Sequence, residues 1–213
     1  MKRRNFIKSS SLLSSAFILP GYTLKPKKNL YNDKIKLSLV GCGGRGTGAV
    51  INALNADDNI ELISMCDIFE DKIQSSLNNL KDEFEGTSKI QVKDENCFTG
   101  FDGYKKTIDN SDVVILATPP GFRPQHFEYA VNSSKHVFVE KPIATDISGI
   151  KRFIESAKLV KKKKLNVVVG LQRRYQPSYI NTFKQVKRGM VGKITSGIVK
   201  WNSRGVWVKE REK

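Results

Sequence analysis

The 213 residues are 39% hydrophobic and 27% charged, which is typical of a globular protein with a buried core and excludes a wholly disordered or membrane-embedded chain. The net charge of +16 is uneven, because residues 37–140 carry nine Lys and Arg against sixteen Asp and Glu, whereas residues 141–213 carry nineteen against four. A nucleic-acid-binding protein needs basic residues on its binding domain. Here the glycine-rich segment 41–48 lies in the acidic part of the chain, and we expect no nucleic-acid partner.

The N-terminal segment combines positive charge with a short apolar stretch. Arg3 and Arg4 are followed by Phe6, Ile7 and Lys8, and residues 12–19 are apolar but too few to span a membrane. The segment resembles a twin-arginine export signal. A disordered basic tail is the alternative, since no clean small-x-small cleavage site follows. We expect residues 1–33 to be a leader and linker read by the twin-arginine export machinery, and the protein to be periplasmic.

From residue 34 onward, strand-like and helix-like patterns alternate. Apolar runs predict strands at residues 35–40, 60–66, 113–117, 136–139 and 167–169, and helical periodicity predicts helices at 46–54, 71–84, 124–133 and 146–164. Residues 85–112 are irregular, with three glycines. This alternation predicts an α/β fold with a doubly wound parallel (Rossmann) sheet over residues 34–170.

After residue 170 the pattern changes. A helix is predicted at 177–188, and residues 194–201 alternate like the first strand of a different sheet. We expect residues 171–213 to be the start of a second α/β domain.

The glycine-rich turn follows the first predicted strand and opens the first predicted helix. Gly41, Gly43 and Gly46 fit the pattern GxGxxG, and Gly44 and Arg45 lie within it. In such turns the first glycine allows a tight bend, the second allows close approach of a pyrophosphate, and the third allows the helix to pack on the strand. These five residues are therefore our predicted phosphate-binding segment.

An acidic residue stands where a dinucleotide ribose would need one. Asp67 ends the second predicted strand, 21 residues after Gly46, and an acid at about that distance binds a ribose 2′-hydroxyl. A carboxylate repels a 2′-phosphate, so we expect NAD as cofactor. NADP is not excluded, because Arg45 could reach either the pyrophosphate or a 2′-phosphate.

Two further strand ends place residues at the same edge of the sheet. Thr118 and Pro119 end the central strand, where they either shape a wall beside the cofactor or simply terminate the strand. His126 lies in the next helix, and we assign it to the cofactor side with a packing role rather than a catalytic one. Glu140 and Lys141 follow the strand at 136–139, and a lysine there could hydrogen-bond a substrate hydroxyl and pass its proton.

The three cysteines, Cys42, Cys66 and Cys97, lack the paired spacing of a zinc site or a disulfide framework. We expect Cys42 and Cys66 to be small buried thiols, and we predict no metal site.

Five features together identify a family resemblance: the stretches LVGCGGRG, ATPPGFRPQH, HVFVEKP and VGLQRRYQP, and the acid Asp67. In this order they resemble the Gfo/Idh/MocA family of glucose-fructose oxidoreductase and inositol 2-dehydrogenase. The resemblance implies a Rossmann domain, a C-terminal α/β domain with an open sheet, and hydride exchange between a nicotinamide and a carbon of a sugar or cyclitol. It also implies that Lys141 is catalytic and lies at the nicotinamide end of the crevice, and that Glu140 and Pro142 shape the crevice. Glu140 and Lys141 are therefore also predicted to be cofactor-binding residues. The substrate-side residues implied are Arg173, Arg174 and Tyr175.

The chain departs from the family in its second domain. The family typically places an Asp and a His on a later helix, and this sequence has no histidine after His136. Three explanations of this departure are possible: the sequence is a fragment of a longer protein, the gene is truncated, or the protein has lost the family's chemistry. If the second domain is incomplete, we expect the chain to bind NAD weakly and to turn over no substrate. A full-length parent could be a homo-oligomer. An NAD-dependent glycosidase and a non-catalytic NAD-binding module are the alternative functions.

Overall fold

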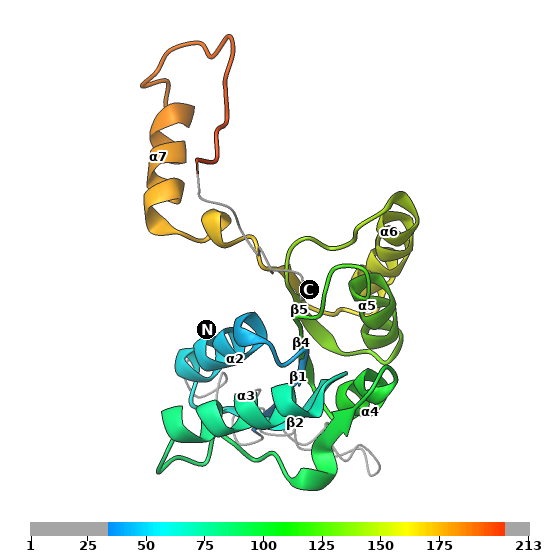
Figure 1. Ribbon diagram of the computed structural model, residues 1–213. Helices are drawn as coiled ribbons and strands as arrows, with labels where there is room; N and C mark the ends of the chain where they lie inside the picture. Colours follow the sequence, from blue (N-terminus) through cyan, green and yellow to red (C-terminus); the bar gives the residue numbers. More distant parts are fainter. Residues whose placement is uncertain (1–33, 203–213) are drawn as a thin grey trace, which may run out of the picture.

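The computed structural model describes residues 34–202, so the predicted leader at residues 1–33 and the last stretch at 203–213 lie outside the described residues. Six parallel strands form one sheet with helices on both of its faces (Figure 1). The strands are β1 (Ile35–Val40), β2 (Ile60–Asp67), β3 (Cys97–Thr99), β4 (Val113–Leu116), β5 (His136–Val139) and β6 (Val167–Val169). The helices are α2 (Gly44–Ala56), α3 (Glu70–Glu83), α4 (Gly103–Asp109), α5 (Arg123–Asn132), α6 (Ile147–Lys162) and α7 (Pro177–Lys187), with short 3-10 helices η1 (Asp94–Asn96) and η2 (Gln172–Arg174).

The strand order is β3-β2-β1-β4-β5-β6, and every pair is parallel. The chain begins in the middle of the sheet, winds out to one edge, returns, and winds out to the other edge. The predicted doubly wound parallel fold is thereby confirmed. The winding reverses between β1 and β4, and in open α/β sheets ligands bind at the carboxyl ends of the strands at this point.

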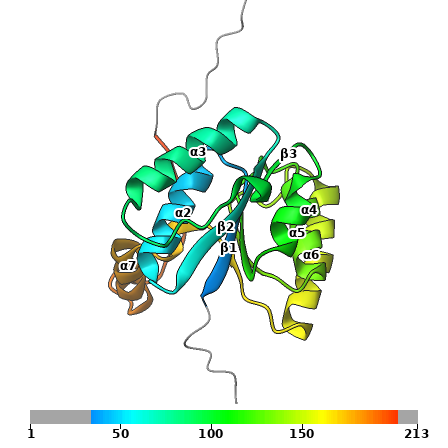
Figure 2. The same cartoon turned by 90° about the horizontal axis from the view of Figure 1, so that it is seen from below.

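Alternating side chains of the central strands build two hydrophobic cores, one on each face of the sheet. Leu37 and Leu39 of β1 belong to the core beneath α2 and α3, together with Leu77. Val40 belongs to the opposite core, which includes Phe127 of α5. Figure 2 shows α2 and α3 on one side of the strands and α4, α5 and α6 on the other. Near-continuous apolar strands are expected where both faces are covered in this way.

Besides the 3-10 helix η1, the irregular stretch at residues 85–112 contains a strand and an α-helix that the sequence did not reveal. Strand β3 has three residues and helix α4 has seven. Both are too short for a periodic pattern, and glycines at positions 100 and 103 flank or begin them. They exist because of tertiary contacts: β3 pairs with the end of β2, and α4 buries Tyr104 and Ile108 against the sheet.

The strand predicted at residues 194–201 is wrong, since this segment has no regular secondary structure. Its apolar side chains are exposed, Ile198 to 84% and Trp201 to 75%. A strand requires a hydrogen-bonded neighbour, and no described residue pairs with this segment. The predicted helix at 177–188 is present as α7, which stands apart from the sheet (Figure 1).

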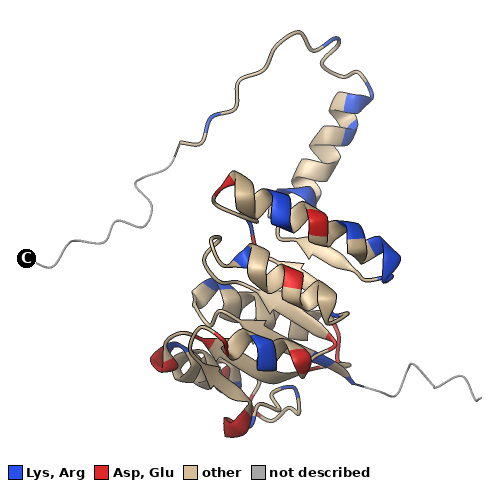
Figure 3. Ribbon diagram, turned by 90° about the vertical axis from the view of Figure 1, so that its right-hand side faces the viewer, with Lys and Arg blue, Asp and Glu red and all other residues tan. Residues whose placement is uncertain are grey.

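Basic side chains gather on α6 and α7 (Figure 3), where the last turns carry Lys161, Lys162, Lys184 and Lys187. Cations at a helix C-terminus interact favourably with the helix dipole. Helix α6 buries Phe153 but leaves Ile147 and Ile154 exposed. Among residues 34–202, every helix is too short or too polar to cross a membrane.

Candidate functional site

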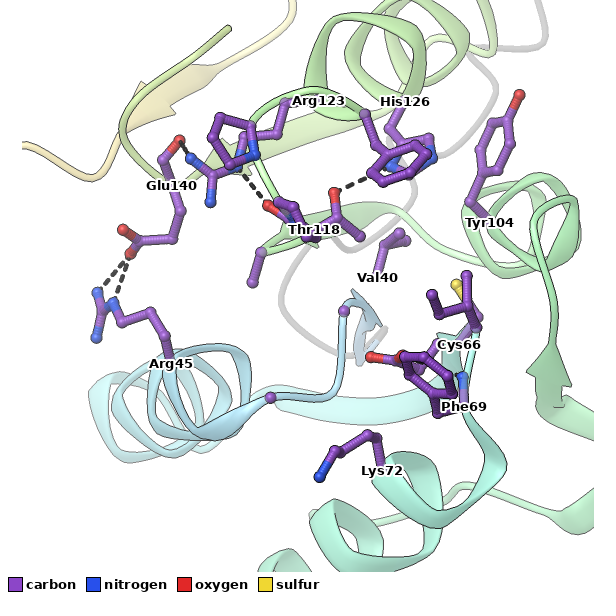
Figure 4. Close-up of a pocket in the computed structure, with 18 of the residues that line it drawn as sticks. Val40, Arg45, Cys66, Phe69, Lys72, Tyr104, Thr118, Arg123, His126 and Glu140 are labelled. Atoms are coloured by element: carbon purple, nitrogen blue, oxygen red, sulfur yellow. Dashed lines mark hydrogen bonds and ion pairs between the residues drawn. The ribbon is translucent and has the colours of Figure 1, made fainter. Parts of the chain in front are cut away.

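A cavity of about 590 Å³ opens at the carboxyl ends of β1, β2, β4 and β5, at the point where the winding reverses (Figure 4). Its size lies in the range of small-molecule and cofactor sites. The predicted site residues that line it are Gly41, Gly43, Arg45, Asp67, Thr118, Pro119, His126, Glu140 and Lys141. Residues remote in sequence therefore meet in one cavity because parallel strands end at the same edge of the sheet.

The glycine turn forms the floor beside β1 and β4. Gly41 has φ +99°, and a Cβ there would lie 2.7 Å from the backbone nitrogen of Thr118. A Cβ on Gly46 would lie 2.1 Å from the carbonyl oxygen of Gly41. Both positions therefore exclude any larger residue. The turn aims the N-terminus of α2 into the cavity, where peptide N–H groups and the helix dipole favour an anion.

Gly43 and Gly44 complete the turn. Gly43 precedes α2 and lines the cavity, whereas Gly44 begins the helix without lining it. Gly43 has no side chain with which to cap α2, so the first N–H groups of this helix keep their capacity to bind a ligand.

Asp67 stands at the end of β2 with its carboxylate fixed by backbone groups. Cys42 N donates to Oδ2 at 2.7 Å, and Phe69 N donates to Oδ1 at 3.2 Å. The carboxylate is only half-buried, and its remaining lone pairs can accept hydrogen bonds from a ligand's hydroxyl groups. One bond thus ties the acid to the glycine turn.

Arg45 forms an ion pair with Glu140 across the cavity. Nε donates to Oε1 at 2.7 Å, and Nη2 lies 2.6 Å from the same oxygen. The Glu140 side chain is 3% exposed and that of Arg45 is 53% exposed. A Cβ on Gly170 would lie 2.8 Å from Glu140 Oε1, so the glycine leaves the space that the carboxylate fills. From the sequence, Arg45 was predicted to contact the pyrophosphate or a 2′-phosphate, and the ion pair with Glu140 was not predicted.

Arg123 is a buried guanidinium that the sequence did not single out. Nε donates to the carbonyl oxygen of Thr118 at 2.7 Å, and Nη1 donates to the carbonyl oxygens of Glu140 at 2.9 Å and of Pro142 at 2.5 Å. Desolvation lowers the pKa of Arg123, and the Glu140 carboxylate opposes this shift. A cation in the first turn of a helix opposes the dipole. That feature, at the start of α5, was the available signal for an unusual role.

Lys141 lies between the two carbonyl groups of Glu140 and Pro142 that Arg123 holds. Its side chain is exposed and lines the cavity. The backbone on both sides of Lys141 is thereby fixed, while the amine can reach a ligand.

His126 is a buried, neutral side chain in the cavity wall. Its Nδ1 lies 3.2 Å from Thr118 Oγ1, and its ring centroid is 4.2 Å from that of Tyr104. Burial lowers the pKa of His126 to about 4. At neutral pH the ring therefore contributes packing and one hydrogen bond but no charge.

Three exposed aromatic rings line the cavity in the segments that follow β2, β3 and β4. Phe69, Phe101 and Phe122 are 58%, 69% and 40% exposed, and the rings of Phe101 and Phe122 are 6.0 Å apart. The sequence did not reveal them, since they come from three separate loops. They offer flat apolar surfaces on which a planar group can stack.

The predicted substrate-side residues Arg173, Arg174 and Tyr175 are exposed and lie outside the cavity lining, to which their neighbour Gln172 contributes. The Arg173 guanidinium lies 5.0 Å from the Tyr179 ring and 5.9 Å from the Trp201 ring. The cysteines Cys42 and Cys66 are buried, as predicted. Within residues 34–202, no group of three or more His, Cys, Asp or Glu side chains could hold a metal ion.

Comparison with known proteins places this geometry in a family. The family profile of the Gfo/Idh/MocA oxidoreductases, described as having an NAD-binding Rossmann fold, matches residues 35–171. An inositol 2-dehydrogenase of Salmonella paratyphi B is 28% identical over 162 residues, which are 74% of this chain and 43% of that protein. A glycosyl hydrolase family 109 protein of Shewanella pealeana is 24% identical over 216 residues, covering 92% of this chain and 45% of the relative.

A solved structure shares the same architecture. The scyllo-inositol dehydrogenase of Lactobacillus casei, solved with bound NAD(H) and scyllo-inositol, superposes with a TM-score of 0.59 at 25% identity, covering 76% of this chain and 44% of that one. The present chain thus spans less than half the length of these relatives. The match to the family profile is consistent with the parallel sheet and the glycine turn of the structure. The chain therefore belongs to the Gfo/Idh/MocA family of oxidoreductases.

Proposed function

We propose that the protein is an NAD-dependent oxidoreductase that acts on an alcohol group of a sugar or cyclitol. The observation that carries the proposal is the hydrogen bond from Cys42 N to the Asp67 carboxylate. It brings an anion-binding turn and a ribose-binding acid into one wall of one cavity. Relatives whose names include inositol dehydrogenase support the substrate class.

The cavity residues fit a dinucleotide from end to end. Backbone N–H groups at Gly43 and the start of α2 would hold the pyrophosphate, and Asp67 would accept hydrogen bonds from the ribose hydroxyls. Phe69 and Phe101 supply apolar surfaces on the Asp67 side, where an adenine ring could stack. Thr118, Pro119 and His126 would line the opposite wall.

Lys141 is the proposed catalytic residue. NAD, when bound, supplies a hydride acceptor. The Lys141 amine would hydrogen-bond the substrate hydroxyl and take or return its proton, and the carbonyl groups held by Arg123 would keep this lysine at the crevice edge. Residues 171–213 are proposed to be the start of a substrate domain, with Arg173, Arg174 and Tyr175 on the substrate side.

A second candidate is an NAD-dependent glycosidase, which would oxidise a sugar with NAD, eliminate the leaving group, add water in its place and re-reduce the product with the NADH formed in the first step. Relatives named as glycosyl hydrolase family 109 proteins favour this candidate. It would use the same cavity and the same lysine, and the two reactions differ in their products.

Product analysis tests the proposal. The protein is incubated with NAD and a panel of inositols, sugars and aryl glycosides, and both NADH and the organic products are measured. Accumulation of NADH with an equal amount of oxidised product identifies a dehydrogenase, whereas sugar release without net NADH identifies a glycosidase. NAD binding without either product is the result expected of a chain whose second domain is incomplete. In a protein shown to carry a complete second domain, the same result would refute both reactions and leave a binding module. Lys141→Met should abolish turnover while it leaves NAD affinity within roughly threefold, because the lysine sits beyond the phosphate and ribose contacts.

We also propose that the protein is exported in folded form by the twin-arginine route. The support is the run of Arg3, Arg4, Phe6 and Lys8 ahead of a short apolar stretch. Export of a folded protein would allow the cofactor to bind in the cytoplasm before transfer.

A further inference from the structure

We propose that the Arg45–Glu140 ion pair makes the cavity selective for NAD over NADP, because it holds the Arg45 guanidinium away from the Asp67 side. The inference rests on the proposed dinucleotide binding. It assigns a specificity-determining role to Glu140, a residue that would not itself touch the adenosine half of the cofactor.

The two acids that border the glycine turn lie on opposite sides of it. Asp67 ends β2 and Glu140 follows β5, with β1 and β4 between these strands. Three strand spacings separate them, which is about 14 Å. Figure 4 shows the Arg45 side chain running from α2 toward Glu140, with Phe69 and Lys72 on the other side of the cavity. The Arg45 guanidinium therefore cannot contact Glu140 and a ligand group beside Asp67 at the same time.

A 2′-phosphate at the Asp67 side would need a cation, because the carboxylate repels it. The cations that line the cavity are Arg45, Lys72, Arg123 and Lys141. Arg123 is buried and bonded to three carbonyl groups, and Lys141 follows β5 on the far side. Arg45 and Lys72 are left. Lys72 is already on the Asp67 side, where the neighbouring Asp71 carboxylate at 3.7 Å offsets part of its charge. The release of Arg45 would therefore add a second cation near a 2′-phosphate.

The pair is held in place by the burial of one partner. The Glu140 carboxylate is 3% exposed, and its charge would be left uncompensated if Arg45 turned away. An unpaired buried charge is strongly destabilising. The absence of a side chain at Gly170 leaves room for the carboxylate at the position where Arg45 meets it. A 2′-phosphate would thus have to compete with a buried carboxylate for the same arginine.

The test compares the dissociation constants of NAD and NADP, measured by calorimetry, among matched variants. Glu140→Gln removes the charge that holds Arg45, and we expect the NADP affinity to rise relative to the NAD affinity by roughly two- to fivefold, the value of one exposed charge contact. Any effect of a substitution that is common to both cofactors cancels in the ratio of the NAD and NADP dissociation constants. Arg45→Met should change both affinities by the same factor and should abolish the effect of Glu140→Gln in the double variant.

A matched control is available in Glu128, which pairs with Arg152 between α5 and α6, outside the cavity. Glu128→Gln should leave the cofactor ratio unchanged. If Glu140→Gln does not fold, Gly170→Ala offers a second route, since its Cβ would displace the carboxylate and should shift the ratio in the same direction.

An unchanged ratio in folded Glu140→Gln would overturn the inference, as would a shift that persists in the Arg45→Met background. A selective loss of NADP affinity in Arg45→Met alone would also overturn it. Absence of binding of either cofactor to the unmodified protein would instead refute the proposed function.

Discussion

The Arg123 guanidinium donates a hydrogen bond from Nη1 to the carbonyl oxygen of Glu140 at 2.9 Å, and so joins the start of α5 to the loop after β5. The same side chain also bonds the carbonyl oxygens of Thr118 and Pro142. It is 6% exposed. One buried cation thereby connects the loop after β4 with the loop after β5, which contains Lys141.

Arg123→Met should lower the free energy of unfolding by about 2 to 3 kcal/mol, because three carbonyl groups lose a charged donor. Chemical denaturation measures this loss. Arg152→Met is the control, since its ion pair with Glu128 is exposed and should contribute at most about 1 kcal/mol. Equal losses in the two variants would show that the buried arginine has no special structural role.

Alanine substitutions at two glycines of the turn should affect different properties, the stability of the fold at Gly46 and the binding of NAD at Gly43. Gly46→Ala places a Cβ 2.1 Å from the Gly41 carbonyl oxygen and should destabilise the fold by more than about 2 kcal/mol. A Cβ on Gly43 would have no atom within 4 Å, and its φ of −72° is favourable for alanine. The free energy of unfolding of Gly43→Ala should therefore be nearly unchanged. Its NAD affinity should nevertheless fall, because this glycine allows close approach of the pyrophosphate. Thermal unfolding and calorimetry together check both outcomes, and undiminished NAD affinity in Gly43→Ala would count against the phosphate assignment.

The buried His126 should make stability depend on pH. Its pKa is about 4 in the folded protein against 6.5 for the free side chain, so between these values the unfolded chain binds the proton and the folded chain does not. Stability is therefore complete above pH 6.5 and falls as the pH is lowered toward 4, by about 3 kcal/mol in all. His126→Asn keeps an acceptor for Thr118 but cannot titrate. Urea unfolding at pH 7 and pH 5 should show a smaller difference in this variant, and an equal difference would contradict the assignment.

The export proposal concerns residues outside the described part of the chain. Replacement of Arg3 and Arg4 by lysine should retain the positive charge but abolish recognition of the arginine pair. Cell fractionation should then find the protein in the cytoplasm instead of the periplasm. Replacement of Lys27 and Lys28 by arginine is the control and should not affect location. An undiminished periplasmic fraction in the Arg3→Lys, Arg4→Lys variant would refute the twin-arginine assignment.

Elements bounded by clear chemical signals were predictable from sequence. The strands at 35–40, 136–139 and 167–169 agree with the structure to the residue, because each is an apolar run with glycine or polar residues beyond it. The glycine turn and Asp67 were predictable because their spacing reflects a local strand–turn–helix unit. Short elements were not predictable from sequence, because β3 and α4 depend on contacts with β2, which is remote from them in the sequence.

The side-chain network of the site was only partly predictable. Arg45 and Glu140 were both singled out, but their pairing joins residues 95 positions apart and leaves no local pattern. The same holds for Arg123, whose partners lie at residues 118, 140 and 142. The segment at 194–201 shows the converse, because an alternating pattern predicted a strand for which the described residues supply no partner.

Calorimetric titration of NAD into the protein and its Asp67 variants tests the central claim most directly. The unmodified protein should bind one NAD and should bind NADP more weakly. Asp67→Ala should weaken NAD binding by about 1.5 to 3 kcal/mol, the value of hydrogen bonds to a charged group. Asp67→Asn retains an oxygen for Cys42 N and so controls for the shape of the turn, while its loss of charge should narrow the gap between NAD and NADP. The absence of NAD binding, equal affinity for NADP, or an unchanged NAD affinity in Asp67→Ala would contradict the account.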